Sequence, residues 1–351
     1  MRFLFRLVLF LIVVGVLAGA AIYFGFGRIR EPFKGYATAE QYVELPSGSS
    51  PPAIGERLVA AGVVRDPLTF RAALLMTGRA RELKAGEYRF DRPMSPIEVV
   101  DKIARGEVYR RLVTFREGLT LREMAKVYEE AKLGRAVDFE NAAKDPAAIR
   151  DLDPEASDLE GYLFPDTYSL AREAPGEALV AQMIASFKKV FTDELRAAAR
   201  ARGLTVRQAV ALASLVEKET AVAEERPLVA AVYLNRRAIG MPMQADPTVI
   251  YAMERSGNYS GNIRRDDLQI ASPYNTYRYP GLPPGPIASP GKASLEAAVN
   301  PAGVDYLYFV SKNDGSHVFA RTLDEHNRNV QEWQVRYFRE RRRTASGNSS
   351  P

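Results

Sequence analysis

Apolar residues recur at helical spacing through much of the second half of the chain, and residues 204–220 (LTVRQAVALASLVEKET) show this pattern most clearly. Thr205 and Gln208 form a capping box, in which their side chains bind the free amides of a first helical turn. At about 100° per residue, apolar side chains fall on two opposite lines. The segment is therefore predicted to be a helix that protein covers on most sides, with Glu217 and Glu219 in its last turn.

The rest of the chain mixes short apolar patterns with turn residues, which predicts an α+β fold. Alternating patterns predict strands at residues 42–45, 86–90, 108–115, 306–310 and 317–320. Helical spacing and cap residues predict helices at residues 53–61, 67–76, 95–104, 226–240 and 324–342, and another that begins near Thr120. Residues 272–291 contain too much proline and glycine for regular structure and are predicted to form one long loop.

The N-terminal region contains an uncharged apolar run at residues 7–26. A helix of this length spans about 30 Å, which is the thickness of a bilayer core. Residues 18–20 have the small side chains of a signal-peptide cleavage site, but the apolar run continues beyond them, which favours an uncleaved anchor. Charge alone does not set the orientation, because basic residues flank both ends: Arg2, Arg6, Arg28, Arg30 and Lys34.

Composition narrows the classes of function. The 351 residues are enough for two or three units with ordinary cores. The chain has no cysteine, which excludes disulfides and thiolate nucleophiles, and His317 and His326 lack a third ligand at recognisable spacing. We therefore predict no metal site and structural roles for both histidines. The net charge of +5 comes from scattered residues that follow an anchor, which argues against a nucleic-acid partner.

Glu217 is the strongest catalytic candidate. Its predicted neighbours are apolar, and loss of hydration favours the neutral form of a carboxyl group. A carboxyl group that keeps its proton can act as the general acid for glycosidic cleavage. The alternative is that Glu217 and Glu219 pair with Lys218 or Arg226 in a solvated last turn.

Five motifs resemble the endolytic murein transglycosylase family (MltG, or YceG-like). They are EGYLFPDTY at residues 160–168, VEKETAVAEERPLVAAVYLNRRAIGMPMQADPTVIY at 216–251, SPYNTYRYPGLPPGPIASPG at 272–291, YLYFV at 306–310 and HVF at 317–319. In that family the first glutamate of the EKET motif is the catalytic acid, which corresponds to Glu217, and Glu219 becomes its support. The resemblance also places Gln244 and Asp246 near the cleft.

The resemblance implies a reaction and a location. Protonated Glu217 would give its proton to the bond between N-acetylmuramic acid and N-acetylglucosamine in nascent peptidoglycan strands. The C6 hydroxyl of muramic acid then closes onto C1 with the same glutamate acting as base, which leaves a 1,6-anhydro end and stops elongation without a metal or cofactor. The catalytic part is expected on the periplasmic side of the bacterial inner membrane, held by one helix, with peptidoglycan synthases as possible partners. A hydrolytic muramidase and a non-catalytic wall-binding scaffold stay open as alternatives.

The expected organisation follows from these patterns. Residues 1–6 are the cytoplasmic N-terminus, 7–26 the anchor, 27–40 a linker, 41–115 a subdomain, 116–200 a helical connecting region, 201–342 the catalytic domain and 343–351 a disordered tail. The strand, helix, helix, strand pattern within residues 41–115 looks like a LysM module, which grips N-acetylated glycans, and family members carry such a unit at this place. The same pattern is also typical of any small α+β domain.

Further polar residues are candidates for contact with an N-acetylated sugar through amide, hydroxyl, carboxylate or ring groups. They are Glu160, Asp166, Asn235, Tyr274, Asn275 and Thr276. Each also has a structural interpretation. The loop at residues 160–168 is equally compatible with a corner between helices, Asn235 with a helix terminus, and Tyr274 with a half-buried loop anchor.

Overall fold

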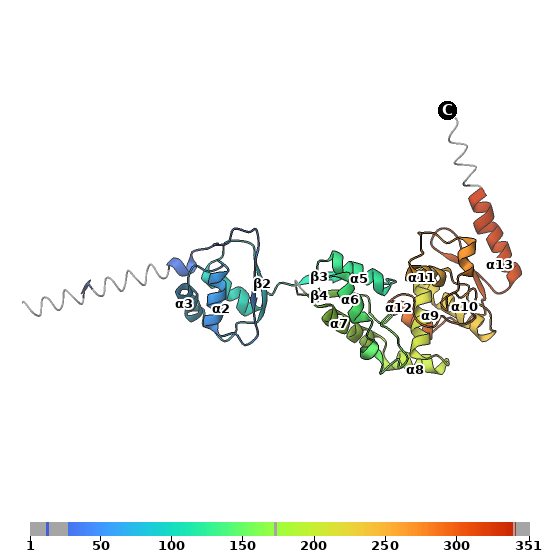
Figure 1. The fold of residues 1–351 in the computed structure, drawn as a ribbon, viewed down its shortest axis with the longest axis horizontal. Helices are drawn as coiled ribbons and strands as arrows, with labels where there is room; N and C mark the ends of the chain where they lie inside the picture. The colour runs from blue at the N-terminus through green and yellow to red at the C-terminus, as the bar shows by residue number, and fades with distance from the viewer. Residues whose placement is uncertain (1–11, 14–26, 172–173, 340, 342–351) are drawn as a thin grey trace, which may run out of the picture. The chain divides into compact units, whose positions relative to one another are not determined.

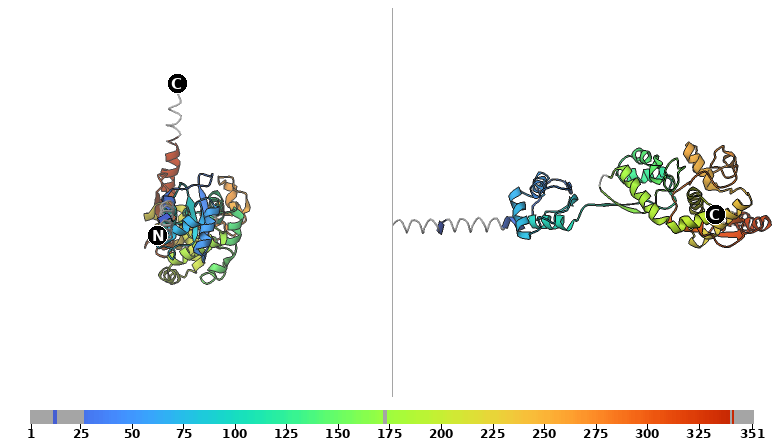
Figure 2. Two further views of the ribbon diagram at one scale, coloured as in Figure 1. Left: turned by 90° about the vertical axis from the view of Figure 1, so that its left-hand side faces the viewer. Right: turned by 90° about the horizontal axis from the view of Figure 1, so that it is seen from below.

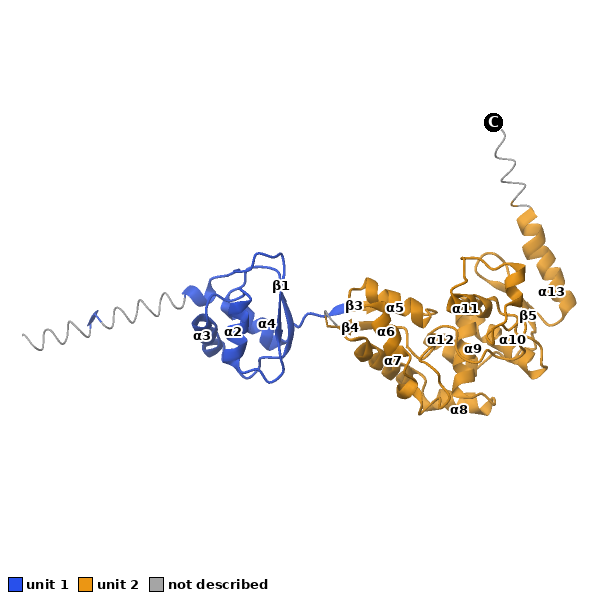
Figure 3. Cartoon of the chain, in the orientation of Figure 1, with its two compact units in different colours: residues 1–111 blue, residues 112–351 orange. Residues whose placement is uncertain are grey.

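The computed structural model describes residues 12–13, 27–171, 174–339 and 341. The chain divides into two compact units, residues 1–111 and 112–351, which Figure 3 distinguishes by colour. Each unit has its own hydrophobic core. The predicted tail at residues 343–351 lies outside the described residues, and so does the predicted anchor apart from residues 12 and 13. In the part of the chain that is described, no helix has both the length and the apolar character needed to cross a membrane.

Among the described residues, the first unit combines the strand pair β1 and β2 with helices α2, α3 and α4 (Figure 1). Strands β1 (Gln41–Leu45) and β2 (Gly86–Phe90) are antiparallel, with Val43 opposite Tyr88. Helices α2 (Pro51–Ala60), α3 (Pro67–Thr77) and α4 (Pro96–Arg105) complete the unit and share its core. The predicted order of strand, helix, helix, strand is therefore confirmed, while the likeness to LysM stays a prediction.

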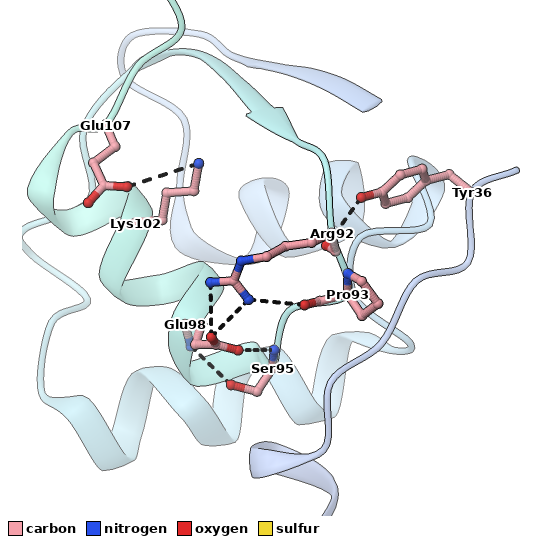
Figure 4. A network of polar contacts seen from close by, with 7 residues as sticks. All are labelled: Tyr36, Arg92, Pro93, Ser95, Glu98, Lys102 and Glu107. Carbon is pink, nitrogen blue, oxygen red and sulfur yellow. Dashed lines mark hydrogen bonds and ion pairs between the residues drawn. The ribbon is translucent and has the colours of Figure 1, made fainter. Parts of the chain in front are cut away.

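Helix α4 shows how local sequence sets element boundaries (Figure 4). Ser95 Oγ accepts a hydrogen bond from the Glu98 amide, and Glu98 Oε2 accepts one from the Ser95 amide at 2.7 Å. Both terminal nitrogens of Arg92 donate to Glu98 Oε1 at 3.1 Å. The helix ends at Gly106, whose φ of 73° lies in the left-handed region that a residue without Cβ adopts freely.

The second unit is mainly helical. Its helices are α5 (Leu121–Glu130), α6 (Ala136–Ala143), α7 (Gly176–Val190), α8 (Asp193–Ala201), α9 (Val206–Glu219), α10 (Arg226–Ala238), α11 (Asp246–Ser256), α12 (Lys292–Val299) and α13 (Leu323–Val330). Short 3-10 turns are η1 (Pro146–Ile149), η2 (Ala223–Glu225) and η3 (Arg265–Gln269), and η4 (Gln331–Arg336) is a π-helical turn. Strand β3 (Arg111–Thr114) pairs with β4 (Thr167–Leu170), and β5 (Tyr308–Ser311) pairs antiparallel with β6 (His317–Ala320).

Helix α9 is the centre of the second unit, and α8, α10, α11 and α12 all pack against it (Figure 1). Residues 209–216 are buried, as the two opposed apolar lines predict, and the predicted capping box of Thr205 and Gln208 is present. The buried Ser214 hydroxyl accepts a hydrogen bond from the Ile287 amide at 3.1 Å. This bond fixes the proline-rich loop to the helix that it covers.

Some predicted boundaries need correction. The strand predicted at residues 108–115 is only Arg111–Thr114 and pairs with β4, because Phe115 packs into the core of the second unit and its amide binds the Asp166 carbonyl. The expected regions 116–200 and 201–342 share that one core. The predicted final helix at residues 324–342 is confirmed in its described part: α13, η4 and residues 337–339 follow one another, α13 packs against β5 and β6, and the far end extends away from the unit in Figures 1 and 2.

Candidate functional site

Glu217 lies in the last turn of α9, where the helix leaves the core, and its side chain is 7% exposed. The Gly291 amide donates to Oε2 at 2.9 Å, and Arg226 Nη2 donates to Oε1 at 3.5 Å. Arg226 is the first residue of α10, and Gly291 is the N-cap of α12. Because α10 and α12 both pack on α9, two separate segments hold the two oxygens of one carboxylate. The ion pair with Arg226 is thus present, but in a covered position rather than in a solvated turn.

The segment that precedes α5 forms one side of this site. The Gly118 amide donates to the Ser289 carbonyl at 2.9 Å, and the Ser289 amide donates to the Leu119 carbonyl at 2.8 Å. Lys218 Nζ donates to the Gly118 carbonyl at 3.2 Å. A methyl group on Gly118 would lie 3.7 Å from Glu217 Cγ. The segment is therefore fixed directly beside the acid.

A second carboxylate, that of Glu117, lies in the same site and was not predicted from the sequence. A methyl group on Gly291 would come within 1.9 Å of Glu117 Oε1, so this carboxylate rests against the glycine whose amide binds Glu217. Burial and the negative charge of Glu217 raise the pKa of Glu117, and Arg226 opposes the shift. Glu117 is an exposed residue and so lies on the solvent side of the nearly covered Glu217.

The site combines two carboxylates with one guanidinium. Among the described residues, Arg226 Nε is buried and has no hydrogen-bond partner. Such a donor is expected to bind water or a ligand, because a buried polar group without a partner costs free energy. The arrangement can therefore supply a proton donor, a second carboxylate and a free N–H within one small region.

Glu219 points into a different cluster, as the helical spacing predicts. Its Oε1 accepts a hydrogen bond from Tyr233 Oη at 2.7 Å. Burial raises the pKa of Glu219, and the nearby charge of Asp246 acts in the same direction. Asp246 in turn accepts a hydrogen bond from Tyr277 Oη at 2.5 Å. Glu219 and Asp246 therefore lie in one region, which is not the one that holds Glu217, and the supporting role of Glu219 stays a prediction.

His317 has a structural role, as predicted. Its Nδ1 lies 2.7 Å from Glu225 Oε2, and its amide donates to Glu225 Oε1 at 2.7 Å. Thr220 Oγ1 also donates to Glu225 Oε2, which joins the end of α9 to β6. Among the described residues, no group of histidine and carboxylate side chains is arranged to hold a metal ion.

Three candidate sugar-binding residues instead hold the loops together. Asn275 is fully buried, and its Nδ2 donates to two main-chain carbonyls of its own loop at 3.0 and 2.9 Å. Thr276 is 1% exposed, and its Oγ1 accepts from the Ala245 amide. Asn235 Nδ2 donates to two carbonyls in the segment before β5, both at 2.9 Å. The amide and hydroxyl groups of these residues thus have main-chain partners, and sugar contact by the three residues stays a prediction.

Gln244 and Asp166 lie on the surface. Gln244 has a φ of 50°, and its main-chain amide donates to the Thr276 carbonyl. The residue is exposed. Asp166 is also exposed, and its Oδ1 accepts from the adjacent Thr167 amide. Neither contacts Glu217 through a hydrogen bond in the structure. Both remain predicted ligand contacts.

Glu160 and Tyr274 belong to another cluster, beside a cavity of about 480 Å³ that α5 and α11 help to line. Glu160 Oε1 accepts from the Leu121 amide at 2.9 Å, and Oε2 accepts from Tyr251 Oη at 3.3 Å. Burial raises the pKa of Glu160 to about 8. The Tyr274 ring packs on Tyr251, with 4.9 Å between ring centroids. Glu160 therefore faces this cavity rather than the carboxylate pair.

Comparison with known proteins gives the family. The model of the YceG-like family matches residues 43–332. Over 333 residues the chain is 33% identical to an endolytic murein transglycosylase of Bacillus subtilis, covering 89% of this chain and 90% of that protein. It is 31% identical over 361 residues to an endolytic murein transglycosylase of Streptococcus pneumoniae, covering 92% of this chain and 64% of that longer protein.

A solved structure gives the same result. The crystal structure of a putative YceG-like protein from Listeria monocytogenes matches with a TM-score of 0.56 and 29% sequence identity, covering 83% of this chain and 98% of that one. Family model, relatives and solved structure all cover most of the chain, and the residues that the family model matches include α9 and the loop that ends at Gly291. The chain belongs to the YceG-like family.

Proposed function

We propose that this protein is a peptidoglycan lytic transglycosylase that cleaves the bond between N-acetylmuramic acid and N-acetylglucosamine and leaves 1,6-anhydro ends. The observation that carries the proposal is the placement of Glu217: a nearly covered carboxyl group at a helix end, oriented through both oxygens, with an exposed acid beside it. The family membership and the printed name of the Bacillus subtilis relative support the same substrate class.

Glu217 acts as the general acid in this proposal. It donates a proton to the glycosidic oxygen as the bond to C1 of muramic acid breaks. The Gly291 amide and Arg226 keep the carboxyl group in one orientation, so that a bound sugar meets a pre-positioned donor. The C6 hydroxyl then bonds to C1, and the reaction needs neither water nor a cofactor.

A muramidase is the second candidate, and Glu117 is the observation that favours it. A hydrolase needs a second carboxylate to activate water or attack C1. Glu117 lies against Gly291 and so supplies a carboxylate within the same site. The two candidates differ in their products, because hydrolysis leaves a reducing end whereas transglycosylation leaves an anhydro end.

We further propose that residues 7–26 anchor the protein in the inner membrane, with both compact units on the periplasmic side. The uncharged run and the family membership support this arrangement. It would place the enzyme beside nascent strands, where endolytic cleavage ends elongation, and near the synthases that make them. Protease treatment of spheroplasts tests the orientation: both units should be digested, and protection of either would contradict it.

The test of the activity uses the full chain in detergent with purified peptidoglycan. Mass spectrometry of the products should show anhydromuramic ends, and Glu217→Gln should reduce their rate of formation at least about 100-fold, the lower limit of general acid catalysis. Glu224→Gln is the matched control, because Glu224 is exposed in the adjacent η2 turn and loses the same charge. Unchanged products with Glu217→Gln would show that Glu217 is not the acid, and wild-type protein that forms no products would leave only a non-catalytic role.

A further inference from the structure

Helix α3 of the first unit exposes apolar side chains where a surface helix usually carries polar ones. Its exposed residues are Pro67, Leu68, Arg71, Leu75 and Met76, of which only Arg71 is polar. Leu68 and Leu75 are 76% and 78% exposed. At about 100° per residue, the five positions fall within one half of the helix surface. We call these five residues the α3 face.

The opposite side of α3 is apolar as well and packs into the core of the unit. Phe70, Ala73 and Leu74 are buried there. A helix that is apolar on all sides is normally covered on all sides. The neighbouring helix α2 follows the ordinary pattern, because Glu56 and Arg57 are among its exposed residues. The α3 face therefore has the composition of a contact surface, although no other described part of the chain covers it.

The α3 face lies close to the point where the chain enters the first unit (Figure 3). Residues 27–30 form a helical turn, and Ile29 within this turn is buried in the core of the unit. Arg65 comes two residues before α3, and its Nη2 lies 3.5 Å from Glu31 Oε1. The Arg65 guanidinium also lies 5.0 Å from the centroid of the Phe33 ring. The start of α3 is therefore held beside the first residues of the unit.

The proposed anchor ends at residue 26, which keeps the bilayer surface close to this part of the unit. Ile29 follows the anchor by three residues, which span at most about 11 Å. Leu75 lies about 10 Å beyond Leu68 along the axis of α3. A tether this short holds the unit at the bilayer at a high effective concentration, which a free protein partner does not have. Position thus favours lipid as the occupant of the α3 face.

The charges around the α3 face suit an anionic lipid surface. Residues 27–34 and 65–71 contain five basic and two acidic side chains. The basic ones are Arg28, Arg30, Lys34, Arg65 and Arg71, and the acidic ones are Glu31 and Asp66. This excess of positive charge attracts anionic headgroups. Arg71 can keep its guanidinium at the level of the headgroups while its apolar neighbours lie deeper.

We propose that the α3 face binds the surface of the membrane that holds the anchor, with Leu68, Leu75 and Met76 at the boundary between the headgroups and the acyl chains of anionic lipids. This contact fixes the orientation of the first unit, which otherwise turns freely on its anchor. The inference goes beyond the proposed reaction and rests only on the proposed anchor. A protein partner is the competing occupant.

The experiment places the full chain in nanodiscs of phosphatidylglycerol and phosphatidylethanolamine, with one protein per disc, so that no second copy can cover the α3 face. Because the chain has no cysteine, Leu75→Cys carries a fluorophore at one place only, and Glu56→Cys on α2 is the matched control. A nitroxide on the lipid acyl chains should quench the label at Leu75 at least about threefold more strongly than the label at Glu56. Aqueous iodide should quench the two labels in the reverse order. A label at Leu68→Cys should behave like the one at Leu75.

A charge reversal tests the electrostatic part of the contact. Arg71→Glu in the labelled Leu75→Cys protein should lower quenching by the lipid nitroxide at least about twofold, because it sets a negative charge against anionic headgroups. Arg57→Glu makes the same change of charge on α2 and should leave the quenching unchanged. An equal loss in both variants would contradict a contact made by the α3 face. Thermal unfolding verifies that all variants are folded.

The outcomes separate this inference from the proposals on which the protein's function depends. If the protein co-elutes with the discs but iodide quenches both labels equally, the α3 face is in solvent and only the inference is wrong. If the label at Leu75 is shielded from both quenchers, protein covers the face and the inference is again wrong. A chain that does not enter the discs shows that the anchor is wrong, and the inference fails with it. The formation of anhydro ends is measured separately and tests the reaction alone.

Discussion

Replacing Glu160 by glutamine should make the stability of the second unit less dependent on pH. Glu160 is 7% exposed, and its oxygens accept hydrogen bonds only from the Leu121 amide and Tyr251 Oη among the hydrogen bonds found in the described residues. Burial raises its pKa from 4.5 to about 8. Glutamine keeps the size of the side chain and an acceptor for the Leu121 amide, but it cannot ionise.

The sign and size of the change in unfolding free energy with pH follow from proton linkage. Because the folded protein holds the Glu160 proton more tightly than the unfolded chain, this stability is fully present below pH 4.5 and is lost as the pH rises toward about 8. At about 1.4 kcal/mol per pH unit, the wild-type protein should lose about 3 kcal/mol of unfolding free energy from this group between about pH 5 and 7.5. The Glu160→Gln variant should not lose this contribution. Glu219 has a raised pKa as well, but it is present in both proteins and its effect cancels.

Thermal unfolding measured by circular dichroism provides the assay. For a unit of this size, about 3 kcal/mol corresponds to a change of about 6–12 °C in Tm. The Tm of Glu160→Gln minus that of wild type should therefore rise by about this amount from about pH 5 to 7.5. An equal difference in Tm at both pH values would show that Glu160 is not held neutral by its surroundings.

Four glycine and asparagine substitutions test other parts of the structure. Gly291→Ala should displace Glu117, whose Oε1 lies 1.9 Å from the added Cβ, and lower cleavage at least about tenfold with little change in Tm; normal cleavage in the digest would contradict the proposed geometry. Asn235→Ala should lower the free energy of unfolding by about 1–3 kcal/mol, because two main-chain carbonyls lose their donor, and an unchanged Tm would refute that role. Gly161→Ala should destabilise the protein far more than Gly203→Ala. Both glycines have positive φ, but only at Gly161 does the added Cβ meet a neighbour, which is Pro286 at 2.3 Å. Equal changes in Tm would contradict this.

Local sequence predicted the elements whose determinants lie within one or two turns of each other. The capping box of Thr205 and Gln208 gave the start of α9, and its apolar spacing gave the burial of residues 209–216. The same spacing placed Glu217 and Glu219 on different faces, and they do lie in different clusters. Such features need no knowledge of the tertiary fold.

Glu117 could not be found in this way. It precedes Glu217 by 100 residues in the sequence, and its relation to Glu217 depends on main-chain hydrogen bonds between residues 118–119 and Ser289. Asn275 shows what an amide in an aromatic loop can do besides binding sugar, since this loop uses it to bind its own carbonyls. Polar side chains in loops can bind either a ligand or main-chain groups with the same kinds of hydrogen bond, so only the burial of the side chain distinguishes the two uses.

The paired main-chain hydrogen bonds between residues 118–119 and Ser289 have a consequence for how this site can evolve. Amide and carbonyl groups are present whatever the side chain, so the spacing of the two acids does not depend on the identity of Leu119. Drift in the surrounding sequence can therefore proceed while Glu117 and Glu217 stay in the same site. What cannot change without cost is the pair of glycines that lets these two strands of chain approach.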